Sequence, residues 1–181
     1  MRTFVAIDLP ETLRAALAQA QQTFRSFCDD ARWTRPEGIH LTLKFLGEIS
    51  DAQNKRVVEA LEQVGPFERF SVEVKGFGFF PQPHRPRVFW AGVLAPSTLS
   101  ELAARVEGHL EKIGFEREQR AFSPHLTLAR FQVPRPQPML VAAAAQATAS
   151  LGKFEASEFF LYESKLSPQG AQYRKLVRFP R

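Results

Sequence analysis

The sequence of 181 residues is poor in cysteine and in long apolar runs. Its single cysteine, Cys28, excludes a disulfide within one chain and a metal centre built from several cysteines. A stretch of mainly small and apolar residues, 139–151, is alanine-rich and too short to span a bilayer. Residues 1–10 lack the apolar run and the small-residue cleavage site of a signal peptide. We therefore expect a cytoplasmic protein without a membrane segment.

Common nucleotide and metal motifs are also absent. The sequence contains neither a G-x-x-x-x-G-K-[ST] loop nor a G-x-G-x-x-G loop. These loops usually bind nucleoside phosphates and nicotinamide cofactors. It has no H-E-x-x-H motif and only four histidines. A protein metal site normally needs three or more nitrogen, sulfur or oxygen ligands. We therefore expect no cofactor and no metal.

The composition is that of a folded globular protein with a basic surface. Hydrophobic residues make up 44% and charged residues 24%, which argues against extensive disorder. The length fits one domain, so we expect residues 1–181 to form a single bilobal unit. A formal net charge of +5 and a pI near 9.7 favour anionic partners, although charge alone does not identify a nucleic acid.

Hydrophobic periodicity predicts an α+β protein. The first half of the chain has a β-α-β-α pattern, and a proline-rich loop at 81–86 separates two later strands. Strands are expected at residues 2–8, 39–46, 70–79, 88–94, 124–131, 154–166 and 172–179. Helices are expected at residues 10–28, 51–64, 97–113 and 138–150.

The clearest sequence feature is the tetrapeptide His-Leu-Thr-Leu, which occurs at residues 40–43 and again at 125–128. Both copies are expected on strands, and helical segments flank each copy. Such a duplication predicts two pseudo-symmetric lobes with mostly antiparallel sheets and with helices packed outside. Each lobe is expected to present one copy of the motif to an active-site cleft between the lobes.

The repeated residues suit acid–base chemistry. Side chains on a strand alternate between its faces, so His40 and Thr42 share one face, as do His125 and Thr127. An unperturbed imidazole has a pKa of about 6.5, so near neutral pH one histidine can act as a base and another as an acid. Threonine hydroxyls can hold the non-bridging oxygens of a phosphate. Two such faces across a cleft therefore predict attack on a phosphodiester.

The two copies resemble the H-x-T-x motifs of the 2H phosphoesterase superfamily. Other stretches resemble the bacterial RNA 2′,3′-cyclic phosphodiesterases, formerly called 2′-5′ RNA ligases. These stretches are residues 2–10, 40–47, 79–93, 123–130 and 161–166. One H-x-T-x motif would be weak evidence, whereas two identical copies about half a chain apart are a strong signal.

This resemblance implies roles for individual residues. His40 corresponds to the proton donor to the leaving 3′ oxygen and His125 to the proton acceptor from water, which yields a 2′-phosphomonoester without a metal. Thr42, Thr127 and Arg130 correspond to substrate-binding residues. Strict alternation from Thr127 would place Arg130 on the opposite face, so its contact with phosphate requires that the strand bulges or ends there. The expected partner is RNA that ends in a 2′,3′-cyclic phosphate, and the expected oligomeric state is a monomer.

Two other functions remain open from the sequence. The same chemistry run backwards, with a ribose hydroxyl in place of water, would make the protein a 2′-5′ RNA ligase. A non-catalytic RNA-binding module would use the same cleft only to hold phosphate. The loop that contains His84, Arg85 and Arg87 could contact RNA or simply be solvated. His109 falls at helical spacing from apolar residues, which favours a structural role.

Overall fold

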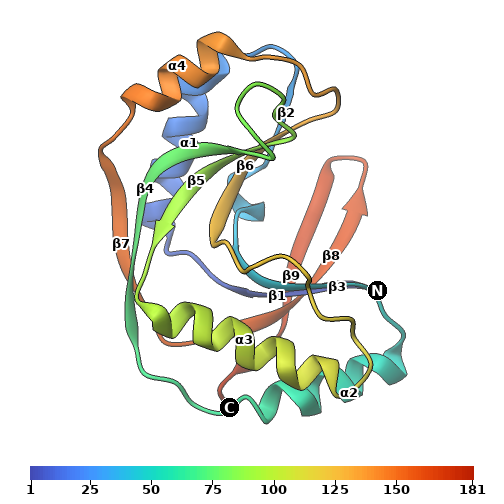
Figure 1. The fold of residues 1–181 in the computed structure, drawn as a ribbon. Coiled ribbons are helices and arrows are strands. Elements are labelled where there is room, and N and C mark those ends of the chain that lie inside the picture. The colour runs from blue at the N-terminus through green and yellow to red at the C-terminus, as the bar shows by residue number, and fades with distance from the viewer.

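The structure, a computed structural model, describes residues 1–181 and contains four α-helices, one 3₁₀ helix and nine strands (Figure 1). The strands are β1 (Arg2–Ile7), β2 (Ala31–Trp33), β3 (Leu41–Glu48), β4 (Phe70–Phe80), β5 (Val88–Leu94), β6 (His125–Phe131), β7 (Ser150–Ala156), β8 (Phe159–Ser167) and β9 (Gly170–Phe179). The helices are α1 (Glu11–Arg25), η1 (Pro36–Gly38), α2 (Asp51–Glu62), α3 (Ser97–Glu111) and α4 (Pro138–Gln146).

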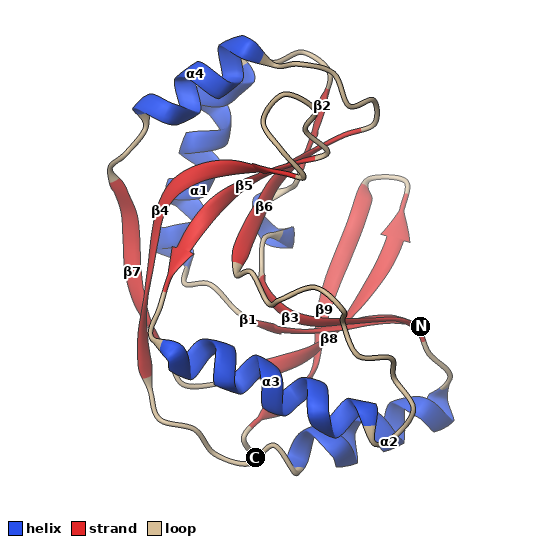
Figure 2. Ribbon diagram, in the orientation of Figure 1, coloured by secondary structure: helices blue, strands red, loops and turns tan.

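The strands form two sheets in which every neighbouring pair is antiparallel. One sheet has the order β3-β1-β8-β9 and the other has the order β2-β6-β5-β4-β7. Helices α1 and α4 lie on the five-stranded sheet, and α2 and α3 lie on the four-stranded sheet (Figure 2). The predicted two-lobed α+β architecture with outer helices is confirmed. No helix combines the length and apolar composition needed to cross a membrane.

The leucines of both motifs belong to one hydrophobic core. A cluster of 36 buried side chains includes Leu41 and Leu43 of β3 together with Leu126 and Leu128 of β6. Burial of a leucine side chain contributes about 1.5–3 kcal/mol, so these four residues anchor the motif strands firmly. The two leucines of each motif therefore stabilise the fold, whereas the histidine and the threonine remain available for chemistry.

Beyond shifts of a few residues at the ends of helices and strands, three differences from the prediction matter for the site. The three-residue strand β2 lies between the helix expected at 10–28 and the strand expected at 39–46, where the sequence predicted no strand. It is too short to produce an alternating pattern, and it forms only by pairing with β6. The single strand expected at 154–166 is two strands, β7 and β8, which belong to different sheets. His40 lies immediately before β3 rather than within it.

Candidate functional site

A cavity of about 300 Å³ lies where the two motif strands meet. Side chains of both motifs line it, namely His40 and Thr42 from the first copy and Thr127 from the second, together with Arg130. The β8–β9 hairpin, which stands opposite β6 in Figure 1, contributes further lining residues. The remaining lining residues are Arg2, Thr3, Phe4, Thr34, Gly38, Ile39, Phe45, Gly47, Ser164, Leu166, Ala171 and Tyr173. Four of the five residues predicted from the sequence therefore share one cavity.

The two motif histidines are held in the same way. The Nδ1 atom of His40 lies 3.1 Å from the carbonyl oxygen of Gly38, and Nδ1 of His125 lies 2.7 Å from that of Ser123. A carbonyl only accepts hydrogen bonds, so each Nδ1 donates and each neutral ring has an unprotonated Nε2. In both motifs the carbonyl comes from the residue two positions before the histidine. Each Nε2 is thus left available to exchange a proton.

His40 occupies the more enclosed environment. Its side chain is only 8% exposed, and its ring lies 5.5 Å from Phe4, 4.5 Å from Tyr162 and 5.2 Å from Tyr173, measured between ring centroids. Burial, reinforced by the nearby Arg14 guanidinium, lowers the pKa of His40 to about 4. His40 is therefore neutral near pH 7.

His125 is half-buried and is not among the residues that line the cavity. It begins β6 two residues before Thr127, and its ring meets Phe80 edge-on at 4.9 Å. Burial lowers the pKa of His125, Arg130 lowers it further, and the hydrogen bond to Ser123 opposes the shift. His125 thus also favours the neutral form, with more access to solvent than His40.

A β-bulge in the second motif brings Arg130 to the cavity. In the pairing of β5 with β6, Trp90 lies opposite Thr127 and Phe89 lies opposite Ala129, so Leu128 has no partner. The extra residue reverses the alternation beyond it. Arg130 consequently faces the same cavity as Thr127, as its lining position shows. The bulge that the contact of Arg130 with the cavity requires is therefore present.

The first motif contains a bulge at the equivalent position. Val5 pairs with Lys44 and Ala6 pairs with Thr42, which leaves Leu43 unpaired. Lys44 turns away from the cavity, and its Nζ lies 2.5 Å from Oε1 of Glu107 on α3.

Phe45 therefore faces the cavity and is 64% exposed. Sequence reasoning missed this residue. The signal that could have found it is its position five residues after His40, the same offset that separates Arg130 from His125.

Tyr173 of β9 is a second cavity residue that was not among the predicted site residues. A Cβ atom at position 38 would lie 2.6 Å from Cε2 of the Tyr173 ring, so the ring can pack there only because residue 38 is glycine. This close approach places Tyr173 against both the His40 ring and the segment whose carbonyl orients that ring.

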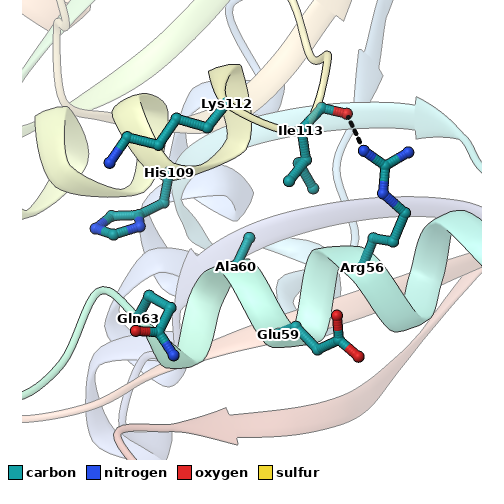
Figure 3. Close-up of a pocket in the computed structure, with 7 residues that line it drawn as sticks. All are labelled: Arg56, Glu59, Ala60, Gln63, His109, Lys112 and Ile113. Atoms are coloured by element: carbon teal, nitrogen blue, oxygen red, sulfur yellow. Dashed lines mark hydrogen bonds between the residues drawn. The ribbon is translucent and has the colours of Figure 1, made fainter.

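A second hollow of about 290 Å³ lies between α2 and α3 (Figure 3). It is lined by Arg56 and Glu59 of α2 and by His109, Lys112 and Ile113 at the end of α3, and Arg56 donates a hydrogen bond to the Ile113 carbonyl at 3.2 Å. The hollow contains no motif residue. Nowhere in the molecule do three or more His, Cys, Asp or Glu side chains group so that they could hold a metal ion.

Comparisons with known proteins point to one family. The family described as "LigT like Phosphoesterase" matches residues 7–90 and 94–173. A protein of Methanothermobacter thermautotrophicus, named RNA 2′,3′-cyclic phosphodiesterase, is 33% identical over 181 residues, which cover 99% of this chain and 98% of the relative. A protein of the same name from Archaeoglobus fulgidus is 34% identical over 179 residues and 99% of each chain.

Solved structures share the fold over almost the whole chain. Protein TT0787 of Thermus thermophilus superposes with a TM-score of 0.80 at 30% identity, covering 99% of this chain and 97% of that one. E. coli LigT in complex with 3′-AMP gives a TM-score of 0.79 at 26% identity, and the match covers 98% of this chain and 96% of the LigT chain. The chain belongs to the LigT-like phosphoesterase family, within the 2H phosphoesterase superfamily that its two H-x-T-x motifs resemble.

Proposed function

We propose that this chain is a monomeric cytoplasmic hydrolase that opens 2′,3′-cyclic phosphate ends of RNA to 2′-phosphomonoesters, with His40 and His125 as general acid and base. The observation that carries the proposal is the single cavity lined by His40, Thr42, Thr127 and Arg130 from both motif segments. The relatives named RNA 2′,3′-cyclic phosphodiesterase support the choice of substrate.

The proposed reaction needs two proton transfers on opposite sides of phosphorus. Nε2 of His125 accepts a proton from the attacking water as the new P–O bond forms. The bond from phosphorus to the 3′ oxygen breaks, and protonated His40 donates its Nε2 proton to that oxygen. The hydroxyls of Thr42 and Thr127 and the guanidinium of Arg130 donate hydrogen bonds to the non-bridging oxygens. Each positioned proton transfer contributes about 10²–10⁴-fold to the rate.

The assignment of roles has to agree with the different environments of the two histidines. His125 has more access to solvent, which suits a residue that takes a proton from water. His40 is neutral near pH 7, because its pKa is about 4. A bound phosphodiester anion beside the ring raises this pKa by stabilising the imidazolium. The substrate thus helps to create the acid that its own cleavage requires.

Phe45 supports a nucleotide rather than a bare phosphate as the ligand. Its exposed ring lines the same cavity as the phosphate-binding residues. The Phe45 ring packs against the Phe4 ring, with 6.0 Å between the two ring centroids. Stacking of a base on an aromatic ring is worth about 1–3 kcal/mol and tolerates any base. We assign Phe45 to stack on the nucleobase next to the cyclic phosphate.

The test is turnover of a short RNA that ends in a 2′,3′-cyclic phosphate, with EDTA present. The unaltered protein is expected to release a 2′-phosphomonoester, and His40→Ala and His125→Ala are each expected to lose at least about 10²-fold in rate. Loss of activity in EDTA, or full activity in both variants, would overturn the mechanism. RNA binding without turnover would favour the binding module, and joining of two cut RNA halves would favour ligation.

A further inference from the structure

Helix α1 carries two buried polar side chains on one face. Arg14 is 8% exposed and Gln21 is 2% exposed, and they lie seven residues, or two turns, apart. The other buried residues of the helix are Leu13, Leu17 and Phe24. A buried guanidinium and a buried amide are costly unless they are fully hydrogen-bonded. The hydrogen-bond partners of Arg14 and Gln21 therefore indicate the role of these two buried side chains.

Arg14 holds the segment that leads into the first motif. Its Nη1 donates to the carbonyl oxygens of Pro36 at 2.6 Å and Ile39 at 2.9 Å. Ile39 directly precedes His40, and the carbonyl of Gly38, between the two acceptors, receives the hydrogen bond from the His40 ring. The guanidinium thus fixes the backbone on both sides of the group that orients the imidazole.

An acidic residue and a second cation complete the Arg14 site. Nη2 of Arg14 donates to Oδ1 of Asp8 at 2.5 Å, and Lys175 of β9 pairs with Oδ2 of the same carboxylate. Burial alone would raise the pKa of Asp8, but hydrogen bonds from Lys175 and Arg14 hold it below its ordinary value. The ionised carboxylate keeps the guanidinium in place at neutral pH.

Gln21 holds the second motif. Its Nε2 donates to the carbonyl oxygens of Thr34 at 2.7 Å and Leu128 at 3.0 Å. Leu128 is the bulged residue that turns Arg130 to the cavity, and its carbonyl also accepts from the Thr34 amide at 2.9 Å. The Gln21 amide therefore fixes the bulge itself. No other helix donates side-chain hydrogen bonds to both motif segments.

We propose that Arg14 and Gln21 are positioning residues through which α1 sets the placement of the two H-x-T-x segments relative to each other. The inference rests on the proposed function, because it assigns them to the same reaction. The two segments belong to different sheets, and the rigid helix spans the distance between them. Misplacement of reacting groups by 1 Å can cost about 10²-fold in rate. Loss of either side chain should therefore reduce kcat more than it changes substrate affinity.

The test compares Arg14→Met and Gln21→Met with Arg25→Met and Gln22→Met, which remove the same groups from exposed positions on α1. Each variant at a buried position is expected to lower kcat at least about tenfold and to change KM less than about threefold. Each control variant is expected to change kcat less than about twofold. Circular dichroism at the assay temperature establishes that each variant is folded. Should Arg14→Met not fold, Arg14→Lys replaces it, and an intermediate kcat is expected because the charge stays but the planar fork is lost.

An NMR titration of the His40 ring separates positioning from general destabilisation. Asp8, Arg14, Lys175, Tyr162 and Tyr173 are the titratable or charged groups around that ring. Arg14→Met is expected to raise the pKa of His40, because it removes the adjacent cation, whereas Gln21→Met is expected to leave that pKa unchanged. Folded variants with the kcat of the unaltered protein would overturn the inference. An inactive unaltered protein would instead overturn the proposed function, while the titration still reports on Arg14.

Discussion

The two H-x-T-x segments have the same four residues but different surroundings. Both histidines donate Nδ1–H to the carbonyl two residues earlier, so the local sequence sets the same tautomer in each. His40 is enclosed by three aromatic rings and lies near Arg14, whereas His125 is half-buried with one aromatic neighbour. The tautomer is therefore a local property, whereas proton affinity is set by tertiary packing.

The segments also differ in the residues that come after the shared tetrapeptide. Each has a bulge at the second leucine, and each therefore turns the fifth residue after its histidine to the cavity. That residue is Phe45 in the first segment and Arg130 in the second. The duplicated backbone thus offers an aromatic ring on one side and a cation on the other. One half is suited to a base and the other to phosphate.

The largest expected effect comes from removing both imidazoles. His40→Ala, His125→Ala and the double variant are each expected to lose at least about 10²-fold in kcat, because the two groups act in one step. The double variant should lose little more than the worse single variant. Single-turnover measurements on a cyclic-phosphate RNA check this. Fully multiplicative losses would contradict joint action and indicate two independent contributions.

The next effect is on stability and distinguishes the two histidines. His40 has a lowered pKa in the folded state, so the unfolded chain binds more protons at low pH. Its contribution to stability is full above about pH 6.5 and is lost as the pH falls through about 4. The loss amounts to about 3 kcal/mol, because each pKa unit is worth about 1.4 kcal/mol. Urea unfolding between pH 7 and pH 4 checks this.

The control for the stability prediction is a comparison of His40→Gln with His125→Gln. The His40 variant should have a flatter dependence of unfolding free energy on pH than the unaltered protein. The change for the His125 variant should be smaller, because His125 is less enclosed. Equal changes for the two variants would contradict the difference in environment.

Arg130 is expected to contribute through phosphate binding. Arg130→Met should lower kcat/KM by about 10–10²-fold, since a hydrogen bond to a charged group is worth about 1.5–3 kcal/mol. Arg130→Lys should recover only part of this loss, because a lysine cannot present two parallel donors. Arg135→Met, at an exposed position outside the cavity, is the matched control. An unchanged kcat/KM for Arg130→Met would remove the residue from the site.

Phe45 should produce the smallest of these effects. Phe45→Ala is expected to raise KM for a nucleotide substrate about tenfold, from lost stacking, and Phe45→Trp is expected to retain affinity. Phe27→Ala is the control, because Phe27 is 36% exposed but does not line the cavity. A cyclic phosphodiester without a base should bind Phe45→Ala and the unaltered protein equally. Equal losses with both kinds of substrate would argue against stacking.

The sequence alone was sufficient for the fold class and for four of the residues that line the candidate cavity. Alternating and helical patterns located the main elements, since burial of one face imposes those periods. The repeated tetrapeptide predicted both histidines and both threonines as site residues, because residue type and spacing carry the chemistry of a short motif. The leucines that alternate with these residues are buried in the core.

Only the tertiary structure decided the rest. Strand β2, the division of residues 154–166 between two sheets and the bulges at Leu43 and Leu128 depend on pairing with strands that are distant in sequence. The roles of Phe45 and Arg130 depend on those bulges. The low pKa of His40 depends on burial and on Arg14, which the fold brings to it from another element. Local periodicity contains no information about such long-range contacts, because it records only which face is buried.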